Sequence, residues 1–263
     1  MNFKLGEYVT RESYNNDLVF QIIDIEEDIA YLRGVDVRLY ADSELDDLNK
    51  VTIKKETDRT DIEKVESLIS LDRSEYFYLP GKIVQFDSDK YYLDRCIKFY
   101  KDMHLEAYGI KVKENEVEEV IMETLEKYKP DIVVITGHDF LKKNAKDKSK
   151  IENYQNSENF VNAIKKARIY EKNQDKLIII SGACQSNYEE LIKAGSNFAS
   201  SPKRINIHAL DPAIIASCVA LSPVNKEIDL ISLIDKTHYG SAGMGGIITN
   251  GTMYVGYPRW LKK

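Results

Sequence analysis

Cys184 and His138 are the two side chains in this sequence whose chemical types and positions favour covalent chemistry. Each comes shortly after an apolar run: DIVVITG leads into His138, and KLIIISGA leads into Cys184. A thiol is a strong nucleophile once it is deprotonated, and an imidazole, whose unperturbed pKa is about 6.5, exchanges protons near neutral pH. The pair therefore predicts nucleophilic attack by sulfur, with the histidine as its acid/base partner.

A lone cysteine or histidine is more often a structural residue, and this interpretation is kept for the other cysteines. Cys96 and Cys218 fall on the apolar faces of expected helices, so we assign them to the core. Cys184 and His138 differ because each lies in a turn of small residues at the end of one of two consecutive apolar strands. His208, at the end of the expected strand RINIHA, is the main competitor of His138 as the base. The histidines that rank below these two are His104 and His238.

The elements that must position this pair form an α/β pattern over residues 79–263. Short apolar runs alternate with amphipathic stretches, which is typical of a mostly parallel sheet flanked by helices. The carboxyl ends of parallel strands meet at one edge of the sheet, and neighbouring strands lie about 4.8 Å apart, so we expect His138 and Cys184 to face one cleft. The expected strands are KIVQFD, LEAYGIKV, DIVVIT, KLIIIS and RINIHA, and the expected helices cover roughly residues 88–103, 114–128, 157–171, 188–194 and 212–221.

Two details of this domain are also expected from local signals. Ser157 precedes the apolar stripe of its helix and predicts an N-cap. After residue 229 we expect a short helix, and the glycine-rich stretch GSAGMGGIITNGTMYVG predicts a terminal hairpin preceded by a mobile loop.

Residues 1–55 predict a small all-β module of the SH3-like or Tudor-like barrel type. The stretches EYVTR, LVFQIIDI and IAYLRGVDVRLY are rich in β-branched and aromatic residues, and turn-forming residues separate them. Residues 56–78 are expected to be a charged linker, of which 56–75 has helical spacing of its apolar residues. The positions with that spacing are Ile62, Val65, Leu68 and Ile69.

The composition is that of a soluble globular protein and disfavours several classes of function. A net charge of −6 is unusual for a generic binder of nucleic acid or anionic membranes. Three scattered cysteines make neither a disulfide framework nor a zinc pair, which indicates a reducing compartment. No stretch has the apolar run of a signal peptide or of a membrane span, so we expect a cytosolic protein. No metal or organic cofactor is expected, because the chain has no G-x-G-x-x-G after the first strand of the sheet and no cluster of metal-ligand residues.

The order and spacing of the pair resemble those of the caspase-like cysteine peptidases, which include caspases, legumain, gingipain and clostripain. In these enzymes the histidine follows one strand and the cysteine follows the next, and in caspases about 50 residues separate them, with a Q-A-C motif at the cysteine. Here 46 residues separate His138 from Cys184, and Gly182 stands at the position of the glutamine. The resemblance implies a caspase-like sheet and peptidase activity.

The chain is more closely similar to the YabG family of sporulation-specific peptidases of spore-forming Firmicutes. The similar stretches are GEYVTRESYNND, ITGHD, SGACQS and AGSNFASSPKRINIHALDP. They extend over nearly the whole chain, and the block 182–212 is the most specific. The resemblance implies a cysteine peptidase that processes spore-coat and related precursor proteins, cleaves itself, and works in the mother cell and the developing spore.

Caspase-like peptidases mostly have Gly after the catalytic His, where this chain has Asp139. The resemblance assigns one oxyanion donor to the backbone N–H at that position, and the turn that holds Cys184 offers a second N–H. The acidic side chain of Asp139 is expected to line a pocket for a basic substrate residue or to orient His138, or else to be solvated or to cap a helix. The other candidates for substrate binding are Asp211, for the same pocket, and Ser200 and Arg204, for the substrate groove or for loop packing.

Two other functions fit parts of the sequence. A glutaminase-like amidase would pair Cys184 with His208 or His238, although Ser186 stands where the usual G-x-C-x-G elbow has its second Gly. A non-catalytic scaffold would use the β module to bind a spore-coat partner. For a peptidase, the charged segments 56–75 and 141–150 are the expected zones of self-cleavage, since proteases cut mobile loops.

Overall fold

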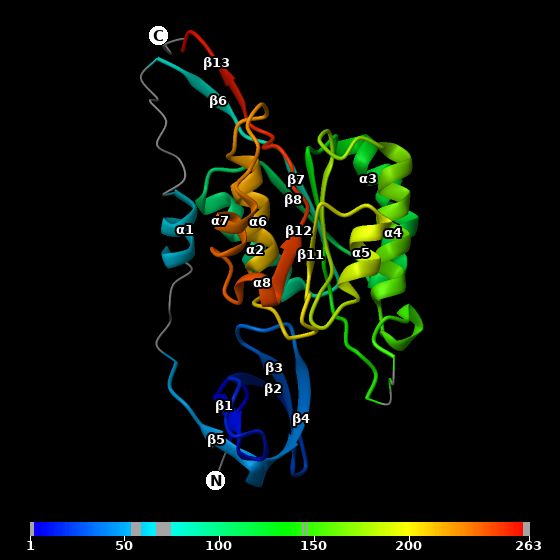
Figure 1. Ribbon diagram of the computed structural model, residues 1–263. Coiled ribbons are helices and arrows are strands. Elements are labelled where there is room, and N and C mark those ends of the chain that lie inside the picture. Colours follow the sequence, from blue (N-terminus) through cyan, green and yellow to red (C-terminus); the bar gives the residue numbers. More distant parts are fainter. Residues whose placement is uncertain (1–2, 54–58, 67–74, 144, 146, 260–263) are drawn as a thin grey trace. The chain divides into compact units, whose positions relative to one another are not determined.

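The computed structural model describes residues 3–53, 59–66, 75–143, 145 and 147–259, and the chain divides into two compact units, Met1–Thr57 and Asp58–Lys263. The first unit contains a five-stranded antiparallel sheet (Figure 1) with the strand order β4-β3-β2-β1-β5. Its strands are β1 (Tyr8–Arg11), β2 (Phe20–Glu26), β3 (Ile29–Gly34), β4 (Tyr40–Glu44) and β5 (Leu48–Lys50), with short 3-10 helices at Glu12–Tyr14 and Leu45–Asp47. One face carries a core of Phe3, Val9, Phe20, Ile22, Ala30, Leu32 and Leu48.

The stretch IAYLRGVDVRLY, expected as one strand, is interrupted after Gly34. The N–H of Gly34 donates to the carbonyl oxygen of Leu39 at 2.6 Å, so the chain forms a tight loop before β4 begins at Tyr40. A Cβ at position 34 would lie 2.3 Å from the carbonyl oxygen of Val37, and only glycine fits this approach.

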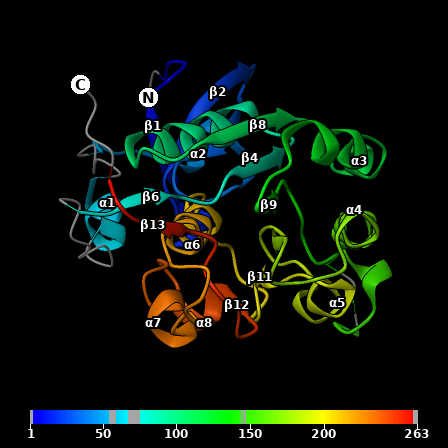
Figure 2. The same ribbon diagram turned by 90° about the horizontal axis from the view of Figure 1, so that it is seen from above.

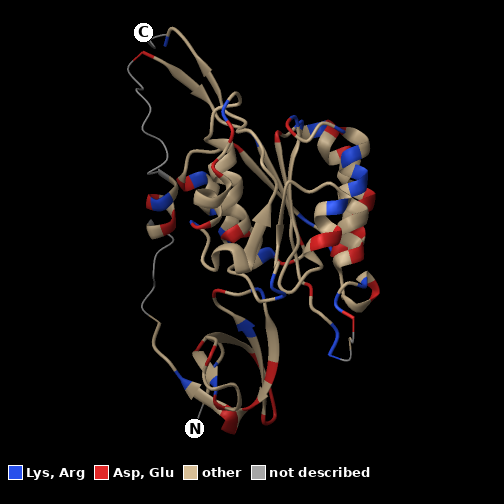
Figure 3. Ribbon diagram, in the orientation of Figure 1, with Lys and Arg blue, Asp and Glu red and all other residues tan. Residues whose placement is uncertain are grey.

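The second unit is built on a six-stranded sheet with the order β12-β11-β10-β9-β7-β8. Its strands are β7 (Ile83–Asp87), β8 (Ala107–Lys111), β9 (Ile132–Ile135), β10 (Ile178–Ser181), β11 (Phe198–Ser200) and β12 (Met244–Gly246). All neighbours pair in parallel except β11 and β12. The two central strands β9 and β10 are fully buried and carry no charged residue (Figure 3), because helices cover both faces of the sheet.

The helices lie on both faces of this sheet (Figures 1 and 2). Successive side chains of β9 point to opposite faces: Ile132 and Val134 belong to one apolar cluster, and Val133 and Ile135 to the other. The first cluster includes residues of α2 (Lys90–Asp102), α6 (Asp211–Ala220), α7 (Leu230–Ile234) and α1 (Arg59–Glu66), where Val65 is fully buried. The second includes residues of α3 (Val117–Tyr128), α4 (Ser157–Tyr170) and α5 (Tyr188–Ala194).

Four of the five expected strands and all five expected helices of this domain are confirmed within a few residues, but the expected strand RINIHA is wrong. The strand after β10 is β11, formed by FAS a few residues earlier, and it pairs with β10 on one side and β12 on the other. Since β11 takes the place beside β10, the RINIHA segment is left to cross the edge of the sheet. His208 therefore does not end a strand.

The expected C-terminal hairpin is also wrong. After α8 (Gly240–Gly243), β12 joins the large sheet, whereas β13 (Tyr254–Gly256) pairs with β6 (Phe77–Leu79) in a separate two-stranded sheet. The two halves of the glycine-rich stretch thus find distant partners instead of each other. The short helix expected after residue 229 is confirmed as α7.

Two local expectations need correction or limitation. Asn156, not Ser157, occupies the N-cap position of α4, and the Ser157 hydroxyl instead donates to Asp139. In the expected linker helix 56–75, the structure describes α1, and Leu68 and Ile69 lie outside the described residues.

Short 3-10 helices occur at Glu114–Glu116 and Ile151–Asn153. Among the described residues, no helix has the length and apolar character needed to cross a membrane.

Candidate active site

His138 and Cys184 follow neighbouring strands at the carboxyl edge of the large sheet. β9 and β10 pair in parallel with Ile135 opposite Ser181, and each candidate comes three residues after this pair. The N–H of Gly182 donates to the carbonyl oxygen of Ile135 at 3.0 Å, so the two chains stay paired up to the start of the loops. The structure therefore brings the loops that carry the candidate base and nucleophile side by side.

Two hydrogen bonds tie these two loops together. The hydroxyl of Ser186 donates to Oδ2 of Asp139 at 2.8 Å. The N–H of Leu141 donates to the side-chain oxygen of Gln185 at 3.3 Å. Each bond joins a residue close to the candidate histidine with a residue close to the candidate cysteine, so the two loops hold a defined relative position.

The carboxylate of Asp139 is buried and accepts four hydrogen bonds. Hydroxyls of Ser157 and Ser186 donate to Oδ2, and the N–H groups of Phe140 and Asn156 donate to Oδ1. Burial raises the pKa of Asp139, although the hydrogen bonds oppose this increase. Because donors occupy both oxygens, the arrangement favours an anchoring role over a substrate pocket. The structure shows no acceptor for the N–H of Asp139 among the described residues, and its backbone follows directly on that of His138.

The imidazole of His138 is about 30% exposed, and residues of α2 and of its N-cap lie against it. Its Nε2 lies 3.5 Å from Oδ2 of Asp89, whose own side chain is only 8% exposed. The ring also packs edge-to-face against Tyr92, with 6.2 Å between the ring centroids. Two hydrogen bonds hold the backbone of His138. Its N–H donates to Glu114 at 2.7 Å, and its carbonyl oxygen accepts from Asn156 at 2.8 Å.

Two glycines allow these loops to pack closely. A Cβ at Gly137 would lie 2.5 Å from Oε1 of Glu114, the same oxygen that binds the N–H of His138. Gly182 has a φ of +97°, and a Cβ there would lie 2.5 Å from the hydroxyl of Ser200. The small residues that the sequence shows before each candidate are therefore required by close contacts.

Cys184 lies at the end of its turn with its side chain in the core, and the residue is 2% exposed. The N–H of Ile207 points at the sulfur at 3.4 Å, and the thiol lies 3.9 Å from the carbonyl oxygen of the same residue. The segment that contains Ile207 therefore covers the thiol.

Arg204 holds the covering segment, residues 201–208, against α5 and the loop before α4. Its guanidinium pairs with Glu189 and donates to the hydroxyl of Tyr154 at 2.5 Å and to the carbonyl oxygen of Ser201 at 3.2 Å. The side chain is only 11% exposed. Arg204 therefore holds segment 201–208 in place over Cys184 and does not project into a groove.

Asp211 contacts both of the alternative candidate bases, His208 and His238. Its buried carboxylate accepts from the N–H of His208 at 3.3 Å and from the N–H of His238 at 2.9 Å, and it also contacts Nδ1 of His238 at 2.8 Å. Nε2 of His238 lies 3.4 Å from Asp61 on α1. Burial lowers the pKa of His238, but its hydrogen bond to Asp211 and the charges of Asp211 and Asp61 outweigh burial and raise it.

His208, Asp211 and His238 bring possible metal-ligand atoms within 4.8 Å of one another, the one such group among the described residues. The two rings are stacked, with 3.5 Å between centroids and 24° between planes, so their nitrogen lone pairs do not converge on one point. The Nδ1 atoms are already bonded, in His208 to the N–H of Leu210 and in His238 to Asp211. These three side chains are therefore poorly arranged to bind one metal ion.

The residues predicted to bind substrate thus have internal partners. The hydroxyl of Ser200 donates to the carbonyl oxygen of Ala183 beneath the Cys184 turn, at 2.8 Å. Sequence reasoning missed Asp89 and Asp61, whose contacts with His138 and His238 depend on the tertiary fold. A local signal existed only for Asp89, which caps α2 by accepting from the N–H of Tyr91 at 2.8 Å.

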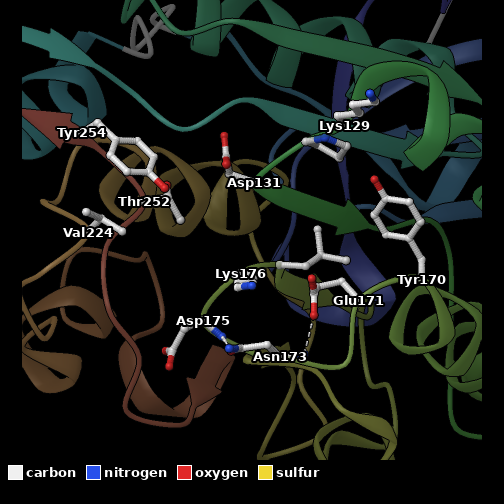
Figure 4. Close-up of a pocket in the computed structure, with 12 residues that line it drawn as sticks. Lys129, Asp131, Tyr170, Glu171, Asn173, Asp175, Lys176, Val224, Thr252 and Tyr254 are labelled. Atoms are coloured by element: carbon white, nitrogen blue, oxygen red, sulfur yellow. Dashed lines mark hydrogen bonds between the residues drawn. The ribbon is translucent and has the colours of Figure 1, made fainter.

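A pocket of about 570 Å³ lies at the other edge of the sheet (Figure 4). It is lined by residues that precede β9 and β10, among them Asp131 and Lys176, and by residues near β13, among them Tyr254. His138 and Cys184 follow the carboxyl ends of the same strands, so this pocket contains none of the predicted catalytic residues.

Comparisons with known sequences find a family and a similar protein that match nearly the whole chain. The sequence model of the family described as YabG peptidase U57 matches residues 4–73 and 62–258. The sporulation-specific protease YabG of Bacillus subtilis (strain 168) is 37% identical over an alignment 286 positions long, which covers 98% of this chain and 99% of that protein. The similarity therefore includes both compact units and both loops described above.

Proposed function

Since the chain belongs to the YabG family of peptidases, we propose that it is a sporulation-specific cysteine endopeptidase that processes spore-coat and related precursor proteins and also cleaves itself. Its membership of a peptidase family makes protein the substrate. The name of the similar protein supports a role in sporulation, and we place that role in the cytoplasm of the mother cell and at the developing spore coat.

The observation that carries the cysteine mechanism is the position of Cys184 and His138 at equivalent places on neighbouring strand ends. In the proposed reaction, Cys184 Sγ transfers its proton to His138 and attacks the peptide carbonyl carbon. The carbonyl oxygen becomes an oxyanion, for which the N–H groups of Asp139 and Cys184 are the donors. His138 then gives the proton to the departing amine, and water hydrolyses the thioester, with His138 taking a proton from the water.

The buried thiol adds one requirement to this reaction. Ile207 covers the sulfur, so segment 201–208 must move aside before a peptide carbonyl can come within bonding distance of it. Binding of a protein substrate is a suitable trigger, since active-site loops commonly open and close with substrate.

Cleavage of spore proteins tests this proposal directly. Wild-type and Cys184→Ala proteins are incubated with a mixture of spore-coat precursor proteins, and mass spectrometry reads the new termini. We expect termini to appear with the wild-type protein alone and the two proteins to unfold at similar temperatures. Cleavage by Cys184→Ala at the wild-type rate would exclude Cys184 as the nucleophile.

The domain description belongs to the same proposal. We propose a caspase-like peptidase domain over 79–263, a charged linker over 56–78 and an SH3-like or Tudor-like barrel over 1–55. The parallel order β10-β9-β7 with functional candidates at the strand ends supports the caspase-like domain. The five antiparallel strands of the first unit support the barrel. Of the expected self-cleavage zones, 56–75 lies largely outside the described residues, as do Asn144 and Lys146 of 141–150.

A second candidate base is supported by one observation. The segment over the sulfur of Cys184 continues directly into His208, which a glutaminase-like amidase would use. The variants His138→Ala and His208→Ala separate these possibilities. For the proposed peptidase, His138→Ala should lower kcat on a peptide containing an identified cleavage site by about 10²–10⁴-fold, whereas His208→Ala should retain most of the activity. The reverse order would favour the amidase arrangement.

A further inference from the structure

Three neighbouring strands of the large sheet end at one level. In the parallel register, Phe86 of β7 lies opposite Ile135 of β9, and Ile135 lies opposite Ser181 of β10. The residues three positions after this row are Asp89 (after β7), His138 (after β9) and Cys184 (after β10), so they follow the order of their strands across the sheet. Neighbouring strands are about 4.8 Å apart, so an acid, an imidazole and a thiol stand in sequence along the sheet edge.

Asp89 is built to face His138. Its Oδ1 accepts the N–H of Tyr91 at 2.8 Å as the N-cap of α2, and its Oδ2 lies 3.5 Å from Nε2 of His138. The N–H of Asp89 donates to the buried carboxylate of Asp87 at 3.0 Å, and Asp87 is itself held by the hydroxyl of Thr136 at 2.9 Å. The backbone of Asp89 and one of its carboxylate oxygens are thus held in place.

We propose that Asp89 is a positioning residue of the peptidase reaction, which holds His138 through Nε2 so that Nδ1 exchanges the proton with Cys184. A carboxylate at one imidazole nitrogen keeps the proton on that nitrogen and leaves the other nitrogen as the base. This inference rests on the proposed function, since it assigns a role within the same reaction. In this proposal Asp89 acts together with the predicted pair, Cys184 and His138.

The cap allows a sharp test, because Asn and Ser are as good N-caps as Asp. In Asp89→Asn the amide oxygen should keep the bond to Tyr91, which places the NH₂ group where Oδ2 stood. That group donates a hydrogen bond to Nε2 and forces the proton of His138 onto Nδ1, the wrong nitrogen. In Asp89→Ser the cap remains, but the short side chain does not reach the ring, so the ring is free to adopt both forms.

Activity should therefore fall in the order wild type, Asp89→Ser, Asp89→Asn, with thermal unfolding nearly unchanged. The measurement is kcat and KM on a peptide containing a cleavage site identified with the wild-type protein. The same carboxylate-to-amide change in a Ser-His-Asp triad lowers kcat about 10⁴-fold, and we expect Asp89→Asn to lower kcat at least about 10²-fold with KM little changed. Asp94→Asn, on the exposed face of α2, is the matched control and should have wild-type kcat.

A second readout does not depend on turnover. In protein labelled with ¹⁵N-histidine, the His138 signals should indicate protonated Nε2 in the wild type and protonated Nδ1 in Asp89→Asn, with assignment from His138→Gln. Equal kcat and the same tautomer in wild type and Asp89→Asn would overturn the role of Asp89. If His138→Ala and Cys184→Ala are inactive in that case, the proposed peptidase still holds; if Cys184→Ala is active, the proposed function itself fails.

Discussion

The hydroxyl of Ser186 donates to the buried carboxylate of Asp139 at 2.8 Å and thereby joins the loop after β10 to the loop after β9. The same carboxylate receives three further hydrogen bonds, one of them from Ser157 at the start of α4. A side chain expected to line a substrate pocket, to orient His138, to be solvated or to cap a helix is the point at which three segments meet.

Asp139→Ala should destabilise the protein because four donors lose their acceptor in a buried site. We expect a loss of about 2–4 kcal/mol in the free energy of unfolding, measured by urea denaturation. Asp139→Asn keeps one oxygen for the two N–H donors and should lose less. An alanine variant as stable as the wild type would show that Asp139 does not anchor these loops.

Gly182→Ala should strain the turn that presents Cys184. The φ of +97° is unfavourable for alanine, and its Cβ would lie 2.5 Å from Ser200 Oγ and 2.7 Å from Leu191 Cδ1. We expect a loss of at least about 2 kcal/mol in stability and a large loss of peptidase activity. Gly6→Ala is the control: its φ is +86°, but its Cβ would lie 4.0 Å from Nε2 of Gln21, so it should be milder and leave activity intact.

Arg204→Ala should expose the thiol of Cys184. Loss of the contacts with Glu189 and Tyr154 loosens segment 201–208, and we expect alkylation of Cys184 by iodoacetamide to become about 10-fold faster. Mass spectrometry of labelled peptides measures this rate. Cys218 is an internal reference, because burial raises its pKa to about 12 and keeps it unreactive. An unchanged ratio of the alkylation rates of Cys184 and Cys218 would show that Arg204 does not hold segment 201–208 over the thiol.

The interaction of His238 with Asp211 and Asp61 predicts a pH-dependent contribution to stability. Because the pKa of His238 is raised in the folded protein, the stabilisation is complete below the unfolded value of about 6.5 and is lost as the pH rises through the folded pKa. His238→Gln should therefore destabilise the protein at pH 5.5, by on the order of 1 kcal/mol, and much less at pH 9.

Urea denaturation at the two pH values measures this difference. His104→Gln, at an exposed histidine, is the control and should show little pH dependence. A His238→Gln effect of equal size at both pH values would mean that the imidazolium charge contributes nothing.

The sequence by itself determined the parts of this protein that depend on local patterns. Strands β9 and β10 are readable because strands covered on both faces form nearly continuous apolar runs, and the long helices are readable from the spacing of their buried residues. Cys184 and His138 could be singled out because each directly follows such a strand. The family resemblance was equally visible in contiguous blocks of sequence and is confirmed.

Tertiary structure decided what depends on partners far apart in the chain. FAS rather than RINIHA became β11 because a three-residue strand takes its stability from pairing with β10 and β12, not from its own composition. Asp89 faces His138 only because β7 lies beside β9. The cover over Cys184 likewise follows from Ile207 folding back across the strand end. Hydrogen bonds and burial arise where strand order brings side chains together, and no local pattern encodes that order.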